Sequence, residues 1–401
     1  MQKKLVIVCL LNFLVAAIMG LILRYFFVFP FSLDFRHLLH AHSHGAMLGW
    51  IYLMIYLLLV HHFVPIKKPA FTRLFWLTEL SVIGMFISFP IQGYAFYSIS
   101  FSTLHIICSY IFIRLIWKNH KEDSKPIRLL LKATLIFMFV STIGIWGVGP
   151  AVARYGLNSE AFQVAIQFFL HFQFNGWFMF AVLAIFLRQF QIHNSEQFPR
   201  FYKTLVAATI LTFALPVSWS VYHPSLLWIN GLGVILQLIS AYYFIKMLQP
   251  HWKTFWEKTQ KVTRWMFGLA LISFILKIAL QSLSIIPEVS AMAYNYHNFV
   301  IGFIHLMMLG VISGFLFSFL LTSNLMNINA KLLKFGVYSF ILGFIATEFL
   351  LLLQGVYFYF SWGMLPQYYL LLFLCSILLP LGIIVVIFNI YNHDTKTIKT
   401  T

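Results

Sequence analysis

The chain has 401 residues, of which 61% are hydrophobic and 9% charged, whereas soluble domains are about 45 to 50% apolar and about 25% charged. This composition excludes a soluble protein. A formal net charge of +17 would suit a nucleic-acid partner, but the positions of the charges give a different explanation.

Long apolar stretches recur from one end of the chain to the other, and each can cross a hydrocarbon core of about 30 Å as a helix. We therefore expect an all-α polytopic membrane protein with about twelve transmembrane helices, in which residues 1–401 form one transmembrane domain. The predicted spans are residues 5–28, 39–60, 72–91, 96–117, 128–148, 160–187, 202–221, 225–246, 265–286, 294–322, 333–356 and 367–391. No internal sequence repeat is evident.

The loops between these spans alternate between basic and nearly uncharged. Arg24, Arg36 and Arg154 fall on one side and Lys277 within a helix, while the rest of the 27 Lys and Arg residues fall on the other side. By the positive-inside rule, both termini are cytoplasmic and the number of spans is even. The charge is thus a topology signal. It indicates membrane lipid rather than nucleic acid as the partner, and a bacterial-type inner (plasma) membrane as the location.

The three cysteines, Cys9, Cys108 and Cys375, lie far apart inside apolar runs, so any metal ligand must come from histidine. Nine histidines lie at the start or in the first half of the second, fourth, sixth, eighth and tenth spans, all of which enter from the external side. Such groups are costly in a bilayer and usually face a bundle interior, which predicts a cofactor layer. Hydrogen-bonded packing residues are the alternative interpretation. The nine are His37, His40, His42, His44, His105, His171, His223, His297 and His305.

The densest histidine cluster opens the second span, in the segment HAHSHGAMLGW. On an α-helix, His40 and His44 share one face, whereas His42 points about 160° away from His40, so only part of the cluster can serve one site. The spacing of His40 and His44 also copies the histidine box of di-metal hydroxylases. That class is disfavoured, because the box is single and opens outward.

Two of these segments resemble subunit I of the haem-copper oxidases. The segment His44-Gly45-Ala46-Met47 looks like the second-span motif that carries a low-spin haem ligand, and the segment 302–310, GFIHLMMLG, looks like the tenth-span motif. The resemblance implies that His44 and His305 ligate one haem, with b-type haem expected. Phe303 stands where the ligand of the oxygen-reducing haem would be, which favours electron transfer, sensing or nitric oxide chemistry over oxygen reduction.

The same resemblance implies a set of copper ligands. His171 resembles the copper ligand of the sixth span, and His105 lies at a similar depth. His223 is a displaced candidate, although its position before Pro224 favours an interfacial residue at the start of a helix.

The chain also resembles the NnrS family of haem- and copper-containing membrane proteins. His40 and His42 open the second span in a similar way, and His297 begins a similar pattern that ends at Gly310. Both families imply haem with copper as a further cofactor, a quinol or cytochrome c as electron donor, and a role in respiration or in the response to nitric oxide or oxygen. An enzyme of this kind would be an oxidoreductase.

Three further ionisable residues lie inside predicted spans, namely Glu79, Lys277 and Glu348. Such residues mark proton or ion routes in membrane proteins, or pair with their neighbours. Two interpretations are open: the residues form a proton pathway beside haem, or they are the coupling groups of a proton-coupled secondary transporter.

Overall fold

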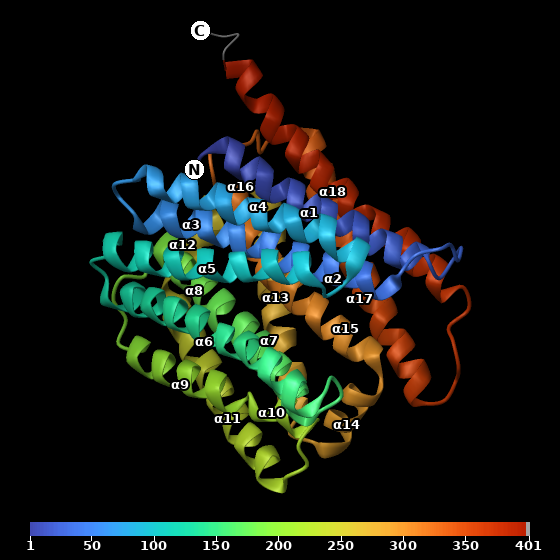
Figure 1. Cartoon of the computed structure of the whole chain (residues 1–401). Coiled ribbons are helices and arrows are strands. Elements are labelled where there is room, and N and C mark those ends of the chain that lie inside the picture. The colour runs from blue at the N-terminus through green and yellow to red at the C-terminus, as the bar shows by residue number, and fades with distance from the viewer. Residues whose placement is uncertain (398–401) are drawn as a thin grey trace.

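A computed structural model describes the backbone of residues 1–397 and the side chains of residues 1–393 apart from Lys258. The described residues form helices and no strand, and twelve helical spans are long and apolar enough to cross a membrane. The predicted all-α polytopic membrane fold is therefore confirmed (Figure 1).

The spans follow one another in three groups of four. The first group comprises α1 (Lys3–Tyr25), then α2 (Phe35–His44), η1 (Gly45–Tyr52) and α3 (Leu53–Phe63) as one span, then α4 (Pro69–Gln92) and α5 (Phe96–Asn119). The second comprises α6 (Lys125–Tyr155), then α7 (Glu160–His171), η2 (Phe172–Phe178) and α8 (Met179–Gln189), then α9 (Phe198–Leu211) with α10 (Ala214–Ser218), then α11 (Pro224–Leu248), which η3 (Gln249–His251) and α12 (Trp252–Lys258) extend. The third comprises α13 (Lys261–Leu283), the short α14 (Pro287–Asn295), then α15 (His297–His305), η4 (Leu306–Ser313) and α16 (Gly314–Leu321), then α17 (Lys331–Tyr359) and α18 (Tyr368–Thr397).

Local sequence explains several helix ends. Proline stands in the first turn of α4, α6 and α11, where its missing N–H leaves no intrahelical bond unmade. The helix α6 runs past the predicted end at residue 148, through Pro150 to Tyr155, and stops at Gly156, whose φ of 84° favours glycine.

The first and last spans lie side by side and close the bundle (Figure 1). Lys3 Nζ donates a hydrogen bond of 3.1 Å to the carbonyl of Tyr391, so the beginning of α1 and the later part of α18 lie on the same side. This agrees with an even number of spans. That this side is cytoplasmic stays a prediction.

The second span of each group lies at the centre of the bundle. We call the half of each span nearer the basic loops its inner half and the other half its outer half, and the inner half of each central span is enclosed. All eight residues of α16 are buried, and the other two segments are buried except at His61 and His62 in α3 and at Arg188 and Gln189 in α8. These three segments are apolar on every face, which is the pattern of a helix surrounded by other helices.

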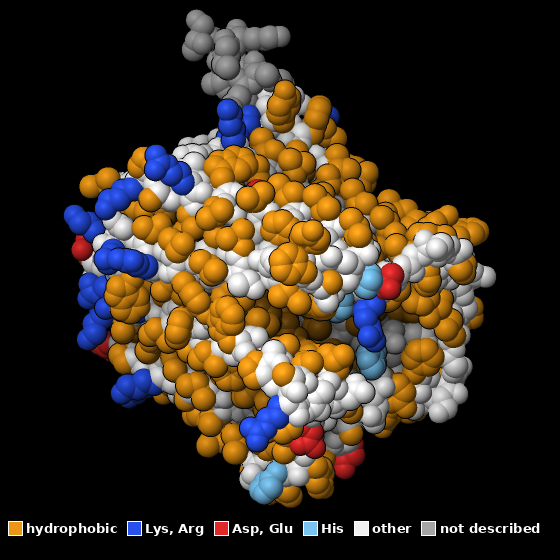
Figure 2. Space-filling model, in the orientation of Figure 1, with side chains coloured by type: hydrophobic (Ala, Val, Ile, Leu, Met, Phe, Trp, Pro, Cys, Tyr) orange, Lys and Arg blue, Asp and Glu red, His pale blue; other side chains and the backbone are white. Residues whose placement is uncertain are grey.

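The outer halves of the same three spans are open. None of the nine residues of α15 is buried, only His171 of the twelve residues of α7 is, and α2 buries only Leu38 and Ala41. Figure 2 shows a hollow on the face of the molecule in view, lined largely by hydrophobic side chains, with histidine side chains near its right-hand end. The bundle is therefore tight in its inner half and splayed in its outer half.

Topology can be tested directly, because Lys and Arg side chains gather at one end of the molecule (Figure 2). Reporter fusions after Lys125 and after residue 258 should report the cytoplasm, since these loops are basic. Fusions near Gly93 and Pro366 should report the outside. A basic loop found outside would contradict the predicted orientation and would move the histidines to the cytoplasmic side.

Candidate functional site

Each central span changes from an α-helix to a π-helix directly after a histidine. The π-helices η1, η2 and η4 have eight, seven and eight residues, and they follow His44, His171 and His305. Long π-helices are rare, and π-bulges occur frequently at functional sites. Three of them in equivalent spans place the candidate site at this level of the bundle.

The same three segments share a short sequence pattern, a histidine followed five residues later by glycine. The glycines are Gly49, Gly176 and Gly310. In each group this glycine faces the first span: a Cβ added there would lie 3.1 Å from Cβ of Asn12, 3.0 Å from Cβ of Phe137 and 2.8 Å from Cβ of Ser273, respectively. The three groups are thus built alike. The repeated histidine and glycine are a sequence signal that is missed when each span is analysed by itself.

His44 faces α4 and the turn that follows it. Its Nδ1 donates to the His40 carbonyl at 2.9 Å, so Nε2 carries the lone pair and accepts a hydrogen bond of 3.3 Å from the Tyr94 hydroxyl. The ring also lies 4.5 Å from the ring of Phe89. Tyr94 exposes 57% of its surface, yet burial around its hydroxyl raises its pKa to about 12, which keeps it a donor.

His105 is a buried histidine of α5 in the first group. It makes a backbone hydrogen bond with Leu48 in η1, while its Nε2 is buried without a partner. The ring of Tyr52 lies 4.5 Å from that of His105 and 5.2 Å from that of Trp177. The Tyr52 hydroxyl and the Trp177 Nε1 are also unpartnered, so three polar atoms remain unsatisfied in one buried place.

His171 and His223 make contacts that suit structural roles. The Nε2 of His171 donates to the Thr209 carbonyl at 2.7 Å, and its ring packs against Phe172 and Phe213. His223 is exposed and caps α11, where its Nδ1 accepts from the backbone N–H of Ser225 at 3.3 Å.

His305 lies with polar residues of α1, α2 and α17. Its Nδ1 is buried without a partner, and it interacts electrostatically with Arg24 and His42. The Nδ1 of His42 donates to the Ala16 carbonyl at 2.8 Å, which leaves the lone pair on Nε2. Glu348 also has an unpartnered Oε1, and its Oε2 would lie 3.6 Å from a Cβ at Gly302, one turn before His305. We call Arg24, His42, His305 and Glu348 the outer cluster.

Among the described contacts, nothing joins His44 to His305, which the sequence predicted as ligands of one haem. His44 interacts with His105 instead, and His305 with His42. His40 is half-buried with its ring 4.6 Å from that of Tyr94, and His297 is exposed at the start of α15.

The three embedded ionisable residues named from the sequence lie apart. Glu79 is buried and accepts a hydrogen bond of 2.7 Å from Asn12, which also donates to the Gly49 carbonyl at 3.1 Å. Lys277 interacts with His171 on the other side of the bundle, and Glu348 belongs to the outer cluster. The described contacts do not link the three into one chain.

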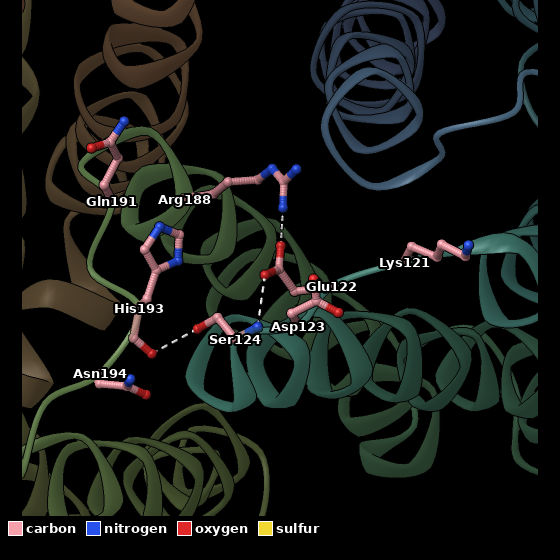
Figure 3. A pocket seen from close by; sticks show the side chains of 8 residues that line it. All are labelled: Lys121, Glu122, Asp123, Ser124, Arg188, Gln191, His193 and Asn194. Atoms are coloured by element: carbon pink, nitrogen blue, oxygen red, sulfur yellow. Dashed lines mark hydrogen bonds and ion pairs between the residues drawn. The ribbon is translucent and has the colours of Figure 1, made fainter.

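A separate pocket of about 560 Å³ lies at the basic end of the molecule, where the loop between α5 and α6 meets the end of α8 (Figure 3). Arg188 pairs with Glu122, whose side chain is 4% exposed, and Ser124 donates to the His193 carbonyl at 2.8 Å. Arg188 also lies over the ring of Phe63. These contacts join the first group of spans to the second, so we interpret the pocket as a crevice beside a structural clamp.

The fold and the histidine layer define a multi-pass membrane protein with a histidine-lined outer half. No protein-family model matches the sequence, and no curated protein matches it. In the part of the chain that the structure describes, no three His, Cys, Asp or Glu side chains converge to hold a metal ion.

The repeated glycines give a stability prediction. In Gly310→Ala the new Cβ would lie 2.6 Å from Cζ of Phe344 and 2.8 Å from Cβ of Ser273, so α13 or α17 must shift. We expect a loss of about 1 to 3 kcal/mol, seen as a lower thermal unfolding midpoint in detergent. Gly268→Ala on α13 is the control, since nothing lies within 4 Å of its added Cβ. Equal midpoints for the two variants would contradict a close approach at Gly310.

Proposed function

We propose that this protein binds haem in its outer half, between the central spans, with His305 as one ligand of the iron. The observation that carries the proposal is that His305 has a buried imidazole nitrogen without a protein partner and interacts electrostatically with a second imidazole, that of His42. A buried polar atom without a partner costs about 1 to 3 kcal/mol, and imidazole is a common ligand of haem iron.

The surroundings of His305 fit the other parts of a haem. Arg24 supplies a cation of the kind that pairs with carboxylates such as the propionates. Gly20 leaves room beside the ring of His42, since a Cβ there would lie 2.8 Å from its Cε1. The helix α15, which carries His305, is largely apolar and none of its residues is buried, as a macrocycle packed against it requires.

The second ligand would come from α2, where two histidines offer an Nε2 lone pair. Resemblance to the oxidases favours His44, whereas the electrostatic interaction of His305 with His42 favours His42. We assign His42, because His44 turns toward α4 and its Nε2 is already bonded to Tyr94. In this assignment the Ala16 carbonyl fixes the tautomer of His42, a role that backbone carbonyls commonly have at ligand histidines.

Haem held in this way would supply an iron centre for electron transfer or for binding a small gas such as nitric oxide or oxygen. With Phe303 at the position of the second tenth-span histidine, we propose electron transfer or nitric oxide and oxygen response rather than oxygen reduction. A b-type haem, a quinol or cytochrome c as donor, and a plasma-membrane location complete the proposal. Metal analysis of the purified protein would show whether it also binds copper.

A proton-coupled transporter is the second candidate, and one observation favours it. Lys277 is 6% exposed and has no hydrogen bond or ion pair to any described residue, and Glu348 keeps an unpartnered oxygen. Buried groups of this kind can change protonation during transport. A transporter would bind no haem and would show proton-dependent flux.

The haem proposal predicts a Soret band in the protein purified from haem-sufficient cells. His305→Ala should abolish low-spin haem, and His42→Ala should lower its content at least tenfold, because each removes an iron ligand. His223→Ala is the matched control, since His223 is exposed and caps its own helix. The absorption spectra of the oxidised and reduced protein, with haem extraction, provide the measurement.

Each result decides between assignments. Loss of low-spin haem in His44→Ala with retention in His42→Ala would overturn the choice of His42. Absence of Soret absorption from folded protein, even after reconstitution with haem, would overturn the haem proposal as a whole.

His171 provides a prediction of its own, because the sequence names it as a copper ligand. If it binds copper, His171→Ala should remove copper and alter reactivity toward nitric oxide or oxygen, while the haem spectrum stays intact. Unchanged metal content and reactivity, with lower thermal stability, would assign His171 to packing through its bond to Thr209.

A further inference from the structure

Unsatisfied polar atoms also gather between the second and third groups of spans, away from the outer cluster. On α11 the Asn230 Oδ1 and the Gln237 Nε2 are buried without partners, and on α13 the Gln281 Oε1 is as well. All three residues are at most 8% exposed. Buried side-chain amides are normally hydrogen-bonded to protein or to ordered water.

These amides lie along the line of contact between α11 and α13, which we call the seam. Asn230 donates 3.3 Å to the Ser284 hydroxyl at the external end of α13, which fixes the register of the two antiparallel helices. Seven residues along an α-helix make almost two turns and rise about 10.5 Å. Gln237 on α11 and Lys277 on α13 are each seven residues inward from that contact, so they lie on the same seam at a similar depth.

The seam continues from Lys277 toward the π-helix η2. Lys277 has no hydrogen bond or ion pair to a described residue, and it interacts electrostatically with His171. Asn175, four residues after His171 in η2, has another unpartnered oxygen. A row of groups that lack partners therefore runs from the external surface to the centre of the membrane.

We propose that a file of water molecules lies between α11 and α13 and connects the external surface with Lys277 and His171. Buried water typically makes two to four hydrogen bonds to such groups, and amide and ammonium side chains supply donors and acceptors in turn. The file gives hydronium or another small cation access from outside to the middle of the bundle. It does not depend on the presence of haem.

Cysteine accessibility tests this file, with silver ion in chloride-free buffer as a small, water-borne probe. In a background that lacks the three native cysteines, Gln281→Cys and Lys277→Cys should react with silver added outside. The matched controls are Leu280→Cys and Leu276→Cys, which are sequence neighbours of the seam positions at the same depth. Their side chains are 40% and 42% exposed and lie on the periphery of the bundle. Reaction is measured as loss of maleimide labelling after denaturation.

We expect the two seam positions to react at least tenfold faster than their controls. Gln281→Leu should slow the reaction of Lys277→Cys, because an apolar side chain removes the hydrogen bonds that hold the water. Asn230→Cys, near the mouth, provides a second seam position if a Lys277 variant fails to accumulate. Equal rates at seam and control positions, or reaction only with silver added on the cytoplasmic side, would overturn the proposal.

Discussion

The bundle depends on a close contact between each central span and the first span of its own group. Lipid tails are as apolar as leucine, so helices associate in a membrane through tight packing rather than through exclusion of water. The repeated glycine in each π-helix removes the side chain that would keep the two backbones apart. This contact draws the inner halves of α3, α8 and α16 into one apolar core, and the outer halves diverge above it.

The same construction produces three different chemical environments. The histidine before each π-helix occupies an equivalent position in its span, but His44 accepts from Tyr94, His171 donates to Thr209, and His305 keeps a nitrogen without a partner. Two of these sites are satisfied by the protein itself. The third one is not, and Glu348 in the same cluster also keeps an unpartnered oxygen, so the outer cluster is the part of the layer best suited to a ligand.

The sequence alone predicts the number and nature of the spans, because hydropathy and loop charge depend on the membrane and not on neighbouring helices. It does not predict which helices meet. His42 lies off the predicted ligand face, and its place beside Gly20 follows from the packing of α2 against α1, which periodicity within one span does not show. The π-helices were missed for a related reason: periodicity analysis assumes an unbroken α-helix, and the repeated histidine and glycine stand too far apart in the chain for local reading.

The closure of α1 on α18 has a consequence for how the protein is made. Arg24 enters the membrane with the first span, but the hydroxyl to which it donates belongs to Ser376 in the last one. A charged side chain within a bilayer costs about 2.5 to 3.5 kcal/mol on insertion scales and is relieved by reaching toward the headgroups. During synthesis Arg24 therefore lacks these partners until α17 and α18, which carry Glu348 and Ser376, have been made, and until then only the headgroups can relieve its charge. The packing of α18 against α1 is then a post-translational step. Nascent chains that lack α18 expose a cationic first span to cellular quality control.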